Sequence, residues 1–441
     1  MRPLPGGARS SHRNRPLLAT TAAAFALVMA ATACGGESGS DDGVVELRFS
    51  WWGSDDRHAN LQEAIGLFEE QNPDVRVVGD YTDWATYWDR LATGTAANDA
   101  PDVIMQDESY LREYGQRGTL ADLGEFGDHL DLSGIDPNVA ENGVMEGQTF
   151  GVATGVNVSA ILADPQAFEE AGVEMPDDTS WTWDDYIEMS IRISEATDGE
   201  VVGTQGMTNE NAFHVYARQN GENLYDEEGN LAFSAETLTS WFEISERILA
   251  DGGQPSASEG VEIAAGGPDQ SVLATNTGAT AYFWTNQLGA VTEAAGRDIE
   301  LLRFPGETEL ERTGMYFKPA MYYSVSAGSD HPEEAARFVD FMLNSTEAAE
   351  VILSDLGLPA NLEVREAITD DLSPADERGA AFLADVEDEV VDGNPPPPIG
   401  SGEIVSINER VYQELVFGNL TAEQAAEQFI EDLEAAIDNG S

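Results

Sequence analysis

Basic side chains are scarce in this chain, and lysine is almost absent. The 441 residues include 82 Asp or Glu against 21 Lys or Arg, which gives a formal net charge of −61. Nucleic-acid binding needs basic side chains that neutralise phosphates, so this composition excludes it. Lys318 is the only lysine and follows Phe317, so the Gly-Lys pair of a nucleotide-binding P-loop is also missing.

Cysteine and histidine are scarce as well, which leaves few side chains for catalysis or metal binding. Cys34 is the only cysteine, so a disulfide within the chain is excluded. The histidines beyond it are widely spaced, and no HExxH, G-x-S-x-G or EF-hand pattern occurs. We therefore expect no cofactor, no metal site and no enzyme activity. Counting cannot exclude the carboxylate pair of a glycoside hydrolase, because acids are so abundant. The histidines concerned are His58, His129, His214 and His331.

The first 33 residues have the pattern of a secretion signal. Four arginines precede an Ala-rich apolar stretch, Leu17 to Ala31, which is too short to favour a membrane span. Small residues then lead into Cys34, and this arrangement resembles a bacterial lipoprotein signal. The resemblance implies that residues 1–33 are a signal peptide and that Cys34 is lipidated. The alternative is an ordinary secretory signal with an incidental cysteine.

Residues 35–43 form a polar tract rich in Gly and Ser, which predicts a flexible tether after Cys34. Acyl chains contribute about 0.8 kcal/mol per buried methylene, so we expect a location outside the cytoplasm, anchored to the cell membrane by lipid only. Loss of residues 1–33 removes four Arg and no acid, which leaves 17 basic against 82 acidic side chains and a net charge of −65. Such an acid excess suggests a solvent of high ionic strength, where the repulsion is screened.

The next segment alternates strand and helix patterns, and the length suggests two or three domains. Strands are predicted at residues 44–52, 75–78 and 101–105. A helical pattern stops at Asn72-Pro73, and a second covers residues 84–92. This order describes a parallel sheet with helices on both faces, in which ligands bind beyond the carboxyl ends of the strands.

Several motifs along the chain occur in the order found in one known family. Together they resemble the extracellular solute-binding proteins of ABC importers, in particular the carbohydrate group that includes maltose-binding protein. The similarity covers nearly the whole chain after the tether. The motifs lie at residues 68–77, 99–104, 114–123, 147–155, 168–176, 182–185, 331–343 and 357–360.

The resemblance implies an α/β clamshell of two lobes, each a mainly parallel sheet flanked by helices, with several hinge crossings. Lobe 1 would comprise residues 44–152 plus 320–370, and lobe 2 residues 153–319 plus 371–441. Crossings are expected near residues 152–157 and 317–320 and after about 370. Pro395 to Pro398 also predicts a stiff extended segment, and Thr421 to Gln424 the capped start of a helix.

The function implied is that of a substrate-binding lipoprotein. It would capture a sugar or oligosaccharide between its lobes and deliver it to ABC permease subunits, acting as a monomer. Two alternatives stay open. The same fold could bind a polyamine, a peptide or another small solute, or the chain could be a secreted glycoside hydrolase.

Sugar binding needs aromatic plates for C–H faces and short acids or amides for hydroxyls. We expect these at the carboxyl ends of strands and at the positions matching the family's ligand contacts. For Trp52 and Trp284, the alternative to ligand contact is packing in the core. Lys318 is expected to find a carboxylate partner. The candidates are Trp52, Ser54, Asp55, Tyr81, Trp84, Gln106, Asp107 and Glu108 in lobe 1, and Asn157, Asn209, Asn211, Trp284, Asn286 and Glu403 in lobe 2.

Overall fold

The computed structural model describes residues 44–206, 209–264, 266–390 and 393–440. The predicted signal peptide of residues 1–33, the lipidation site Cys34 and the tether to residue 43 lie outside the described residues. In the described ranges, no helix combines the length and the apolar character needed to cross a membrane.

The first sheet has the strand order β2-β1-β3-β12-β6. β1 pairs in parallel with β2 and β3, whereas β12 is antiparallel to both β3 and β6. The three strands predicted near the start of this segment are therefore confirmed. Their bounds are β1 (Val45–Trp52), β2 (Val75–Thr82), β3 (Val103–Gln106), β6 (Val152–Ala153) and β12 (Tyr322–Val325).

The second strand is longer than its sequence pattern indicated. We expected an end at residue 78, but β2 continues to Thr82 because it pairs with β1 along its whole length, up to Trp52 opposite Thr82. Asp83 then caps the next helix by accepting a hydrogen bond from the Thr86 amide. Tyr81 consequently lies inside the strand and not after it.

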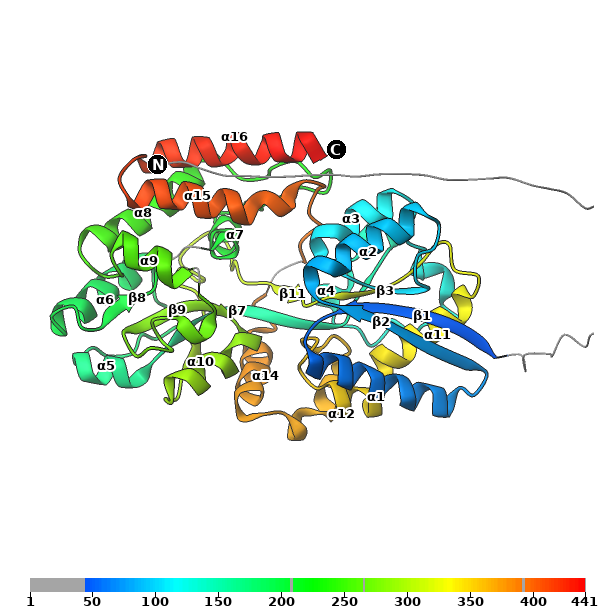
Figure 1. Ribbon diagram of the computed structural model, residues 1–441. Helices are drawn as coiled ribbons and strands as arrows, with labels where there is room; N and C mark the ends of the chain where they lie inside the picture. The colour runs from blue at the N-terminus through cyan, green and yellow to red at the C-terminus, as the bar shows by residue number, and fades with distance from the viewer. Residues whose placement is uncertain (1–43, 207–208, 265, 391–392, 441) are drawn as a thin grey trace, which may run out of the picture. The chain divides into compact units, whose positions relative to one another are not determined.

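Helices cover both faces of the first sheet (Figure 1). One face carries α2 and α3, and the other carries α1, α11 and α12. Leu61, Ile65 and Phe68 of the first helix face the core, and Leu67 is partly buried. Phe68 and Phe49 both pack edge-on against Phe338 of α11. The bounds are α1 (Asp55–Gln71), α2 (Trp84–Ala96), α3 (Glu108–Gln116), α11 (Pro332–Asn344) and α12 (Thr346–Ile352).

The second sheet has the order β10-β7-β9-β8. β7 is antiparallel to β10 and β9, whereas β8 and β9 are parallel. All strands of this path except β7 thus run in one direction, as all strands of the first sheet except β12 do. The strands are β7 (Gly155–Ala163), β8 (Val202–Thr204), β9 (Gly278–Trp284) and β10 (Glu300–Leu302).

Three short segments join the two sheets. The first residues of β7 pair with β11 (Phe317–Pro319) and with β13 (Leu358–Pro359), so segments distant in sequence lie side by side there. Gly155 is required at this point, because a Cβ atom would lie 2.5 Å from the carbonyl oxygen of Leu356. The start of β7 and β11 coincide with the first two expected crossings between the lobes. The lobe boundaries stay a prediction.

The remaining helices surround the second sheet and extend to the C-terminus. The last helix packs against α8 and α15, and it begins as predicted. The Thr421 amide donates to Gln424 Oε1 at 3.1 Å and the Gln424 amide to Thr421 Oγ1 at 3.3 Å. These helices are α5 (Pro165–Ala171), α6 (Trp183–Ala196), α7 (Glu210–Gln219), α8 (Ala235–Ala250), α9 (Ala257–Ala264), α10 (Leu288–Ala295), α14 (Pro374–Val386), α15 (Ile404–Val416) and α16 (Ala422–Gly440). Short elements are α4 (Pro137–Ala140), α13 (Leu362–Ala367), β4 (Val144–Met145) and β5 (Gln148–Thr149).

The proline run lies outside helix and strand, in agreement with the prediction of an extended segment. Arg112 of α3 holds it from the side of the first sheet. The guanidinium donates to the Pro396 carbonyl at 2.7 and 2.9 Å and to the Pro397 carbonyl at 3.2 Å. The segment that leads into α15 is therefore attached to α3.

Candidate functional site

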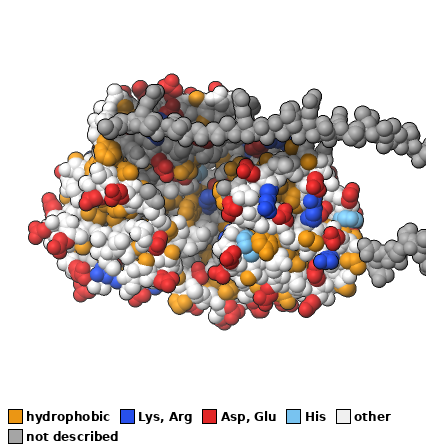
Figure 2. All heavy atoms as spheres, viewed as in Figure 1, with side chains coloured by type: hydrophobic (Ala, Val, Ile, Leu, Met, Phe, Trp, Pro, Cys, Tyr) orange, Lys and Arg blue, Asp and Glu red, His pale blue; other side chains and the backbone are white. Residues whose placement is uncertain are grey.

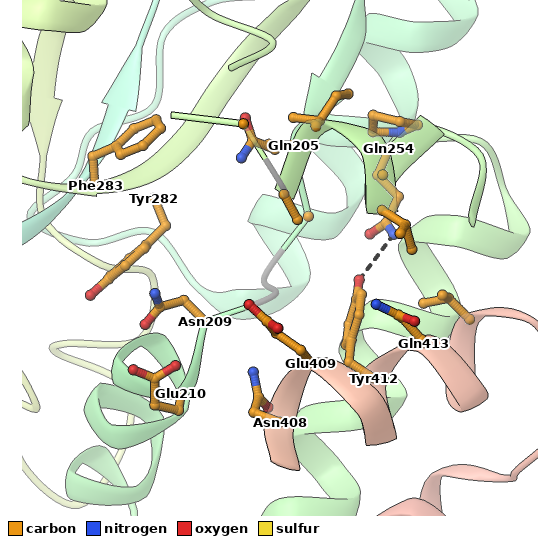
Figure 3. Close-up of a pocket in the computed structure, with 18 of the residues that line it drawn as sticks. Gln205, Asn209, Glu210, Gln254, Tyr282, Phe283, Asn408, Glu409, Tyr412 and Gln413 are labelled. Carbon is orange, nitrogen blue, oxygen red and sulfur yellow. Dashed lines mark hydrogen bonds between the residues drawn. The ribbon is translucent and has the colours of Figure 1, made fainter. Parts of the chain in front are cut away.

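A cavity of about 480 Å³ lies beside the second sheet (Figure 3). Its walls come from the segment after β8, the start of α7, the region of α9, the carboxyl end of β9 and one face of α15. The lining residues are Gln205, Gly206, Asn209, Glu210, Gln254, Pro255, Ser256, Ala257, Gly260, Val261, Ile263, Ala264, Gly266, Gly267, Pro268, Tyr282, Phe283, Trp284, Gln287, Val405, Asn408, Glu409, Tyr412, Gln413 and Val416.

Three consecutive aromatic residues at the end of β9 form one wall. Tyr282 is buried, while Phe283 and Trp284 are half-buried. The strand ends here because Gln287 Oε1 accepts a hydrogen bond from the Trp284 amide at 3.0 Å. The Trp284 ring meets the Tyr316 ring edge-on with centroids 6.0 Å apart. The cavity thus has aromatic surface in a fixed position.

One face of α15 forms the opposite wall. The residues of α15 that line the cavity stand at positions i, i+3, i+4, i+7, i+8 and i+11, which is the spacing of a single helix face. Tyr412 is fixed by its hydroxyl, which accepts a hydrogen bond from Gln254 Nε2 at 3.3 Å (Figure 3). The face comprises Val405, Asn408, Glu409, Tyr412, Gln413 and Val416.

The N-terminus of α7 contributes an amide and a carboxylate. Asn209 caps the helix, and its Oδ1 accepts hydrogen bonds from the Asn211 amide at 2.7 Å and from Asn211 Nδ2 at 2.9 Å. Glu210 is only 9% exposed. Burial raises the pKa of Glu210, and Glu108 and Glu409 raise it further, whereas the charge of Lys318 acts in the opposite direction.

Close to this cavity, an ion pair connects the second crossing with the first sheet. The ammonium of Lys318, on β11, contacts the carboxylate of Glu108 at the start of α3. Lys318 stands opposite Asn157 of β7 in the ladder. The expectation that the only lysine finds a carboxylate is therefore confirmed.

A second cavity of about 50 Å³ lies next to Glu108 and Asn211. His214 lines it, with Nδ1 3.2 Å from the Tyr316 hydroxyl and Nε2 2.8 Å from Asn223 Oδ1. Burial lowers the pKa of His214 to about 3, and the charge of Arg218 lowers it too. This imidazole is consequently neutral at ordinary pH.

The aromatic candidates of the first sheet belong to two separate clusters, one around Trp52 and one around Trp51. Trp52 is 7% exposed and contacts Trp84, Tyr87 and Trp88, with ring centroids 5.0 to 5.5 Å apart. Trp84 is 44% exposed and so presents far more surface than Trp52. Tyr81, also 44% exposed, stacks on buried Trp51 at 5.1 Å.

The candidates at the end of β3 have distinct environments. Gln106 is fully buried, and neither polar atom of its side chain has a hydrogen-bond partner. Asp107 caps α3 by accepting a hydrogen bond from the Ser109 amide at 3.0 Å. Of these three neighbours, Glu108 is the one that reaches the junction of the sheets.

The other candidates lie apart from the cavity of about 480 Å³. Ser54 caps α1 by accepting from the Arg57 amide, and Asp55 is exposed in the first turn of α1. Asn157 and Asn286 line a separate small cavity with Ser354 and Leu358. Glu403 is exposed immediately before α15. The cavity of about 480 Å³ brings together Asn209 and Trp284 from the predicted set, and the cavity of about 50 Å³ brings together Glu108 and Asn211. Ligand contact by any candidate stays a prediction.

Most of the polar residues in the cavity of about 480 Å³ were not among the candidates from the sequence. Gln205 follows the carboxyl end of β8, so the rule applied to the first sheet would have found it. The spacing of the α15 face was also visible in the sequence, although nothing indicated what this face covers. The missed polar residues include Gln205, Gln254, Gln287, Asn408, Glu409, Tyr412 and Gln413, whereas Glu210 was considered together with Asn209 and Asn211. Among the residues with described positions, no group of three or more His, Cys, Asp or Glu side chains could hold a metal ion.

Comparison with known proteins places this chain in a family. Residues 63–377, well over half of the chain, match the family described as bacterial extracellular solute-binding protein. The chain belongs to this family. The membership agrees with the resemblance inferred from the sequence motifs.

Curated relatives of this family member include two proteins named for sugars. The arabinooligosaccharide-binding protein of Halalkalibacterium halodurans is 26% identical over 239 residues, which are 49% of this chain and 51% of the relative. The match thus spans about half the length of that relative. The diacetylchitobiose binding protein DasA of Streptomyces coelicolor is 24% identical over 380 residues, 79% of this chain and 84% of the relative.

A solved structure confirms the fold class. The periplasmic oligogalacturonide binding protein of Yersinia enterocolitica superposes with a TM-score of 0.76 at 22% identity, over 89% of this chain and 100% of that one. At this identity the likeness shows the fold alone. The solute-binding protein fold, with its two α/β lobes, is the one expected from the sequence.

Proposed function

We propose that this solute-binding protein captures a sugar or oligosaccharide and delivers it to the permease subunits of an ABC importer. The observation that carries the proposal is the cavity beside the second sheet, where Tyr282, Phe283 and Trp284 stand near several amide side chains and two carboxylates. Aromatic faces suit the C–H faces of a pyranose, while amides donate to and accept from its hydroxyls.

The position of this cavity fits capture between two lobes. Lys318 and Glu108 lie near Glu210, and the exposed Trp84 presents an aromatic face on the first sheet. Closure about the segments of β7, β11 and β13 would bring the two groups of residues onto opposite sides of one ligand. Binding would then shift the population from an open to a closed form that the permease recognises.

The names of two relatives support a carbohydrate ligand, since both are called binding proteins for oligosaccharides or for a sugar dimer. The same names support a binding role without catalysis. Among the alternatives, a polyamine or peptide is less favoured, because a site for such a ligand does not require the aromatic wall at the end of β9.

We also propose a membrane-anchored monomer outside the cytoplasm. Family membership supports the location, because the family is described as extracellular. Lipidation of Cys34 is supported by the signal pattern and by the tether that follows it. The anchor would keep the protein near its permease by lipid insertion alone.

Calorimetry and thermal unfolding with a sugar panel test the function. The probe is the chain from residue 35 onward, and the panel contains neutral disaccharides and longer oligomers, with spermidine and a tripeptide as non-sugar ligands. We expect saturable binding of at least one carbohydrate. At a concentration of 100 times Kd, such a ligand stabilises the protein by about 2.7 kcal/mol.

Chromatography of the same mixtures separates binding from hydrolysis. A binding protein returns the oligosaccharide intact after prolonged incubation, whereas a glycoside hydrolase releases shorter products. Binding of spermidine or the peptide alone, without any response to a carbohydrate, would contradict the proposed function.

A further inference from the structure

The cavity of about 480 Å³ beside the second sheet has an unbalanced set of charged groups. Of its described lining residues, Glu210 and Glu409 are the only ones with a carboxyl group. Neither Arg nor Lys nor His contributes to the lining in the described part of the chain. The aromatic and amide walls are compatible with many sugars. The two carboxylates, in contrast, favour a positively charged ligand over a negatively charged one.

Lys318 cannot fully compensate the negative charge of these carboxylates. The ammonium of Lys318 is already engaged by Glu108, and Asp107 adds a further negative charge nearby. The carboxylates of Glu210 and Glu409 are close enough to influence one another. A ligand carboxylate placed here would face like charges, which costs binding free energy wherever solvent is displaced.

Glu409 is the carboxylate best placed to meet a ligand. It is exposed on α15, and Figure 3 shows its side chain directed into the cavity, on the same side as Asn209. No described basic side chain forms an ion pair with it. An ionised carboxylate is an acceptor only, so Glu409 requires a donor from the ligand or from water.

A buried amide provides independent evidence that the cavity requires a hydrogen-bond donor. Gln254 lines the cavity and is 7% exposed. Its Nε2 donates to the Tyr412 hydroxyl at 3.3 Å, whereas its Oε1 is buried without a hydrogen-bond partner. A buried carbonyl without a partner is destabilising, and a donor on the ligand would recover part of this loss. The cavity therefore has free acceptors of two kinds.

We propose that the sugar bound in this cavity carries a protonated amine, that Glu409 receives the ammonium group, and that uronic acids are excluded. This inference rests on the proposed function and narrows its ligand to amino sugars. An ammonium group supplies three donors and a positive charge, and the unmodified hydroxyls of the same sugar remain available to the amides and to the Gln254 carbonyl.

Three matched oligosaccharides test the inference by calorimetry at about 0.15 M salt and pH 6.5: the disaccharide of glucosamine, its diacetylated form and a galacturonic acid disaccharide. We expect the amine form to bind at least tenfold more tightly than the acetylated form, and the uronate to give no measurable heat. The advantage of the amine should shrink as salt is raised to 1 M, because the attraction is electrostatic.

Glu409→Gln removes the charge while keeping the size and shape of the side chain. We expect its preference for the amine form to fall below about threefold. Glu414→Gln is the matched control, since Glu414 is an exposed acid on the same helix but outside the cavity lining, and its preference should equal that of the natural protein. Thermal unfolding of both variants confirms that they are folded.

The outcomes separate this inference from the proposed function. Equal or weaker binding of the amine form, or an unchanged preference in Glu409→Gln, overturns the inference, while the proposed function stands if the acetylated form binds. Failure of all carbohydrates, amino sugars included, overturns both. Tight binding of the uronate also overturns the inference and leaves a sugar-binding function in place.

Discussion

Lys318 and Glu108 form an ion pair across the junction of the two sheets. Their side chains are 22% and 28% exposed, so the pair is partly desolvated. Burial alone lowers the pKa of Lys318, but the neighbouring carboxylates of Glu108 and Asp107 outweigh this effect and raise it. The ammonium is therefore charged at all ordinary pH values, and it connects β11 of the junction with α3 of the first sheet.

Removal of one partner should destabilise the protein more than removal of both. Lys318→Met leaves Glu108 close to Asp107 and Glu210 without a counter-charge, and we expect a loss of about 1–3 kcal/mol in the free energy of unfolding. The double variant with Glu108→Gln should recover part of this loss. Urea unfolding of both single variants and of the double variant measures the coupling, and strictly additive losses would show that the pair contributes nothing.

Trp284 is expected to provide stacking surface for the ligand. Trp284→Ala should weaken sugar binding at least tenfold, because it removes half-buried aromatic surface from the cavity wall. Trp284→Phe should lose less, since it keeps a smaller ring. Phe417→Ala is a suitable control, as Phe417 is exposed just after α15 and does not line the cavity. Calorimetry with the best carbohydrate of the panel measures the three affinities, and wild-type affinity in Trp284→Ala would remove Trp284 from the site.

The protonation of His214 should limit stability in acid. The pKa of this buried imidazole is about 3 in the folded chain, below its ordinary value of 6.5. The folded state therefore binds fewer protons than the unfolded state between these values. The contribution of neutral His214 to the free energy of unfolding is complete above pH 6.5. It decreases as the pH falls, by about 1.4 kcal/mol per pH unit.

A His214→Gln variant tests this dependence, because glutamine keeps a polar side chain near Asn223 but does not titrate. We expect the variant to be less stable at pH 7 and to lose less stability than the natural protein between pH 7 and 5. Urea unfolding at both pH values gives the two differences. Equal differences in the two proteins would mean that His214 is not the group responsible.

The architecture of the first sheet followed from local patterns in the sequence. Buried parallel strands read as continuous apolar runs, and α1 and its stop at Asn72 are set by periodicity and by proline. The predicted end of β2 at residue 78 was wrong. Polar residues such as Asp80 indicated a turn, but pairing with β1 keeps them extended. The alignment of one strand with its neighbour depends on tertiary contacts. A stretch of four residues in the sequence carries no signal for it.

The candidate cavity could be predicted only in part for a related reason. Asn209 and Trp284 stand at the ends of elements, where sequence analysis looks for ligands. Glu409 and Gln413 come from a helix more than 100 residues further along the chain, and they resemble an ordinary solvated face. Only the packing of α15 against α16, α8, α7 and α9 turns that face toward β9.

Arg112 should stabilise the proline segment before α15. Its guanidinium is 8% exposed and also donates to the Glu227 carbonyl at 3.4 Å, besides its bonds to Pro396 and Pro397. Arg112→Lys keeps the charge but loses the planar set of donors, so faster hydrogen exchange is expected in residues 399–406. Arg117→Lys, at an exposed position after the same helix, is the control and should leave the exchange unchanged. Equal exchange in both variants would show that the carbonyl contacts do not hold this segment.

Screening of the surface charge should raise the stability of the whole protein. Acidic side chains are spread over the visible face in Figure 2, with few basic ones among them, and the whole chain carries a formal charge of −61. The Debye length falls from about 10 Å at 0.1 M salt to about 3 Å at 1 M, which weakens repulsion between neighbouring carboxylates. We expect the unfolding temperature to rise by several degrees between 0.05 and 1 M NaCl. Sucrose of equal osmolality is the control for solvent exclusion and should give a smaller rise. A temperature that falls with salt would indicate that attractive pairs such as Arg303 with Glu389 outweigh the repulsion.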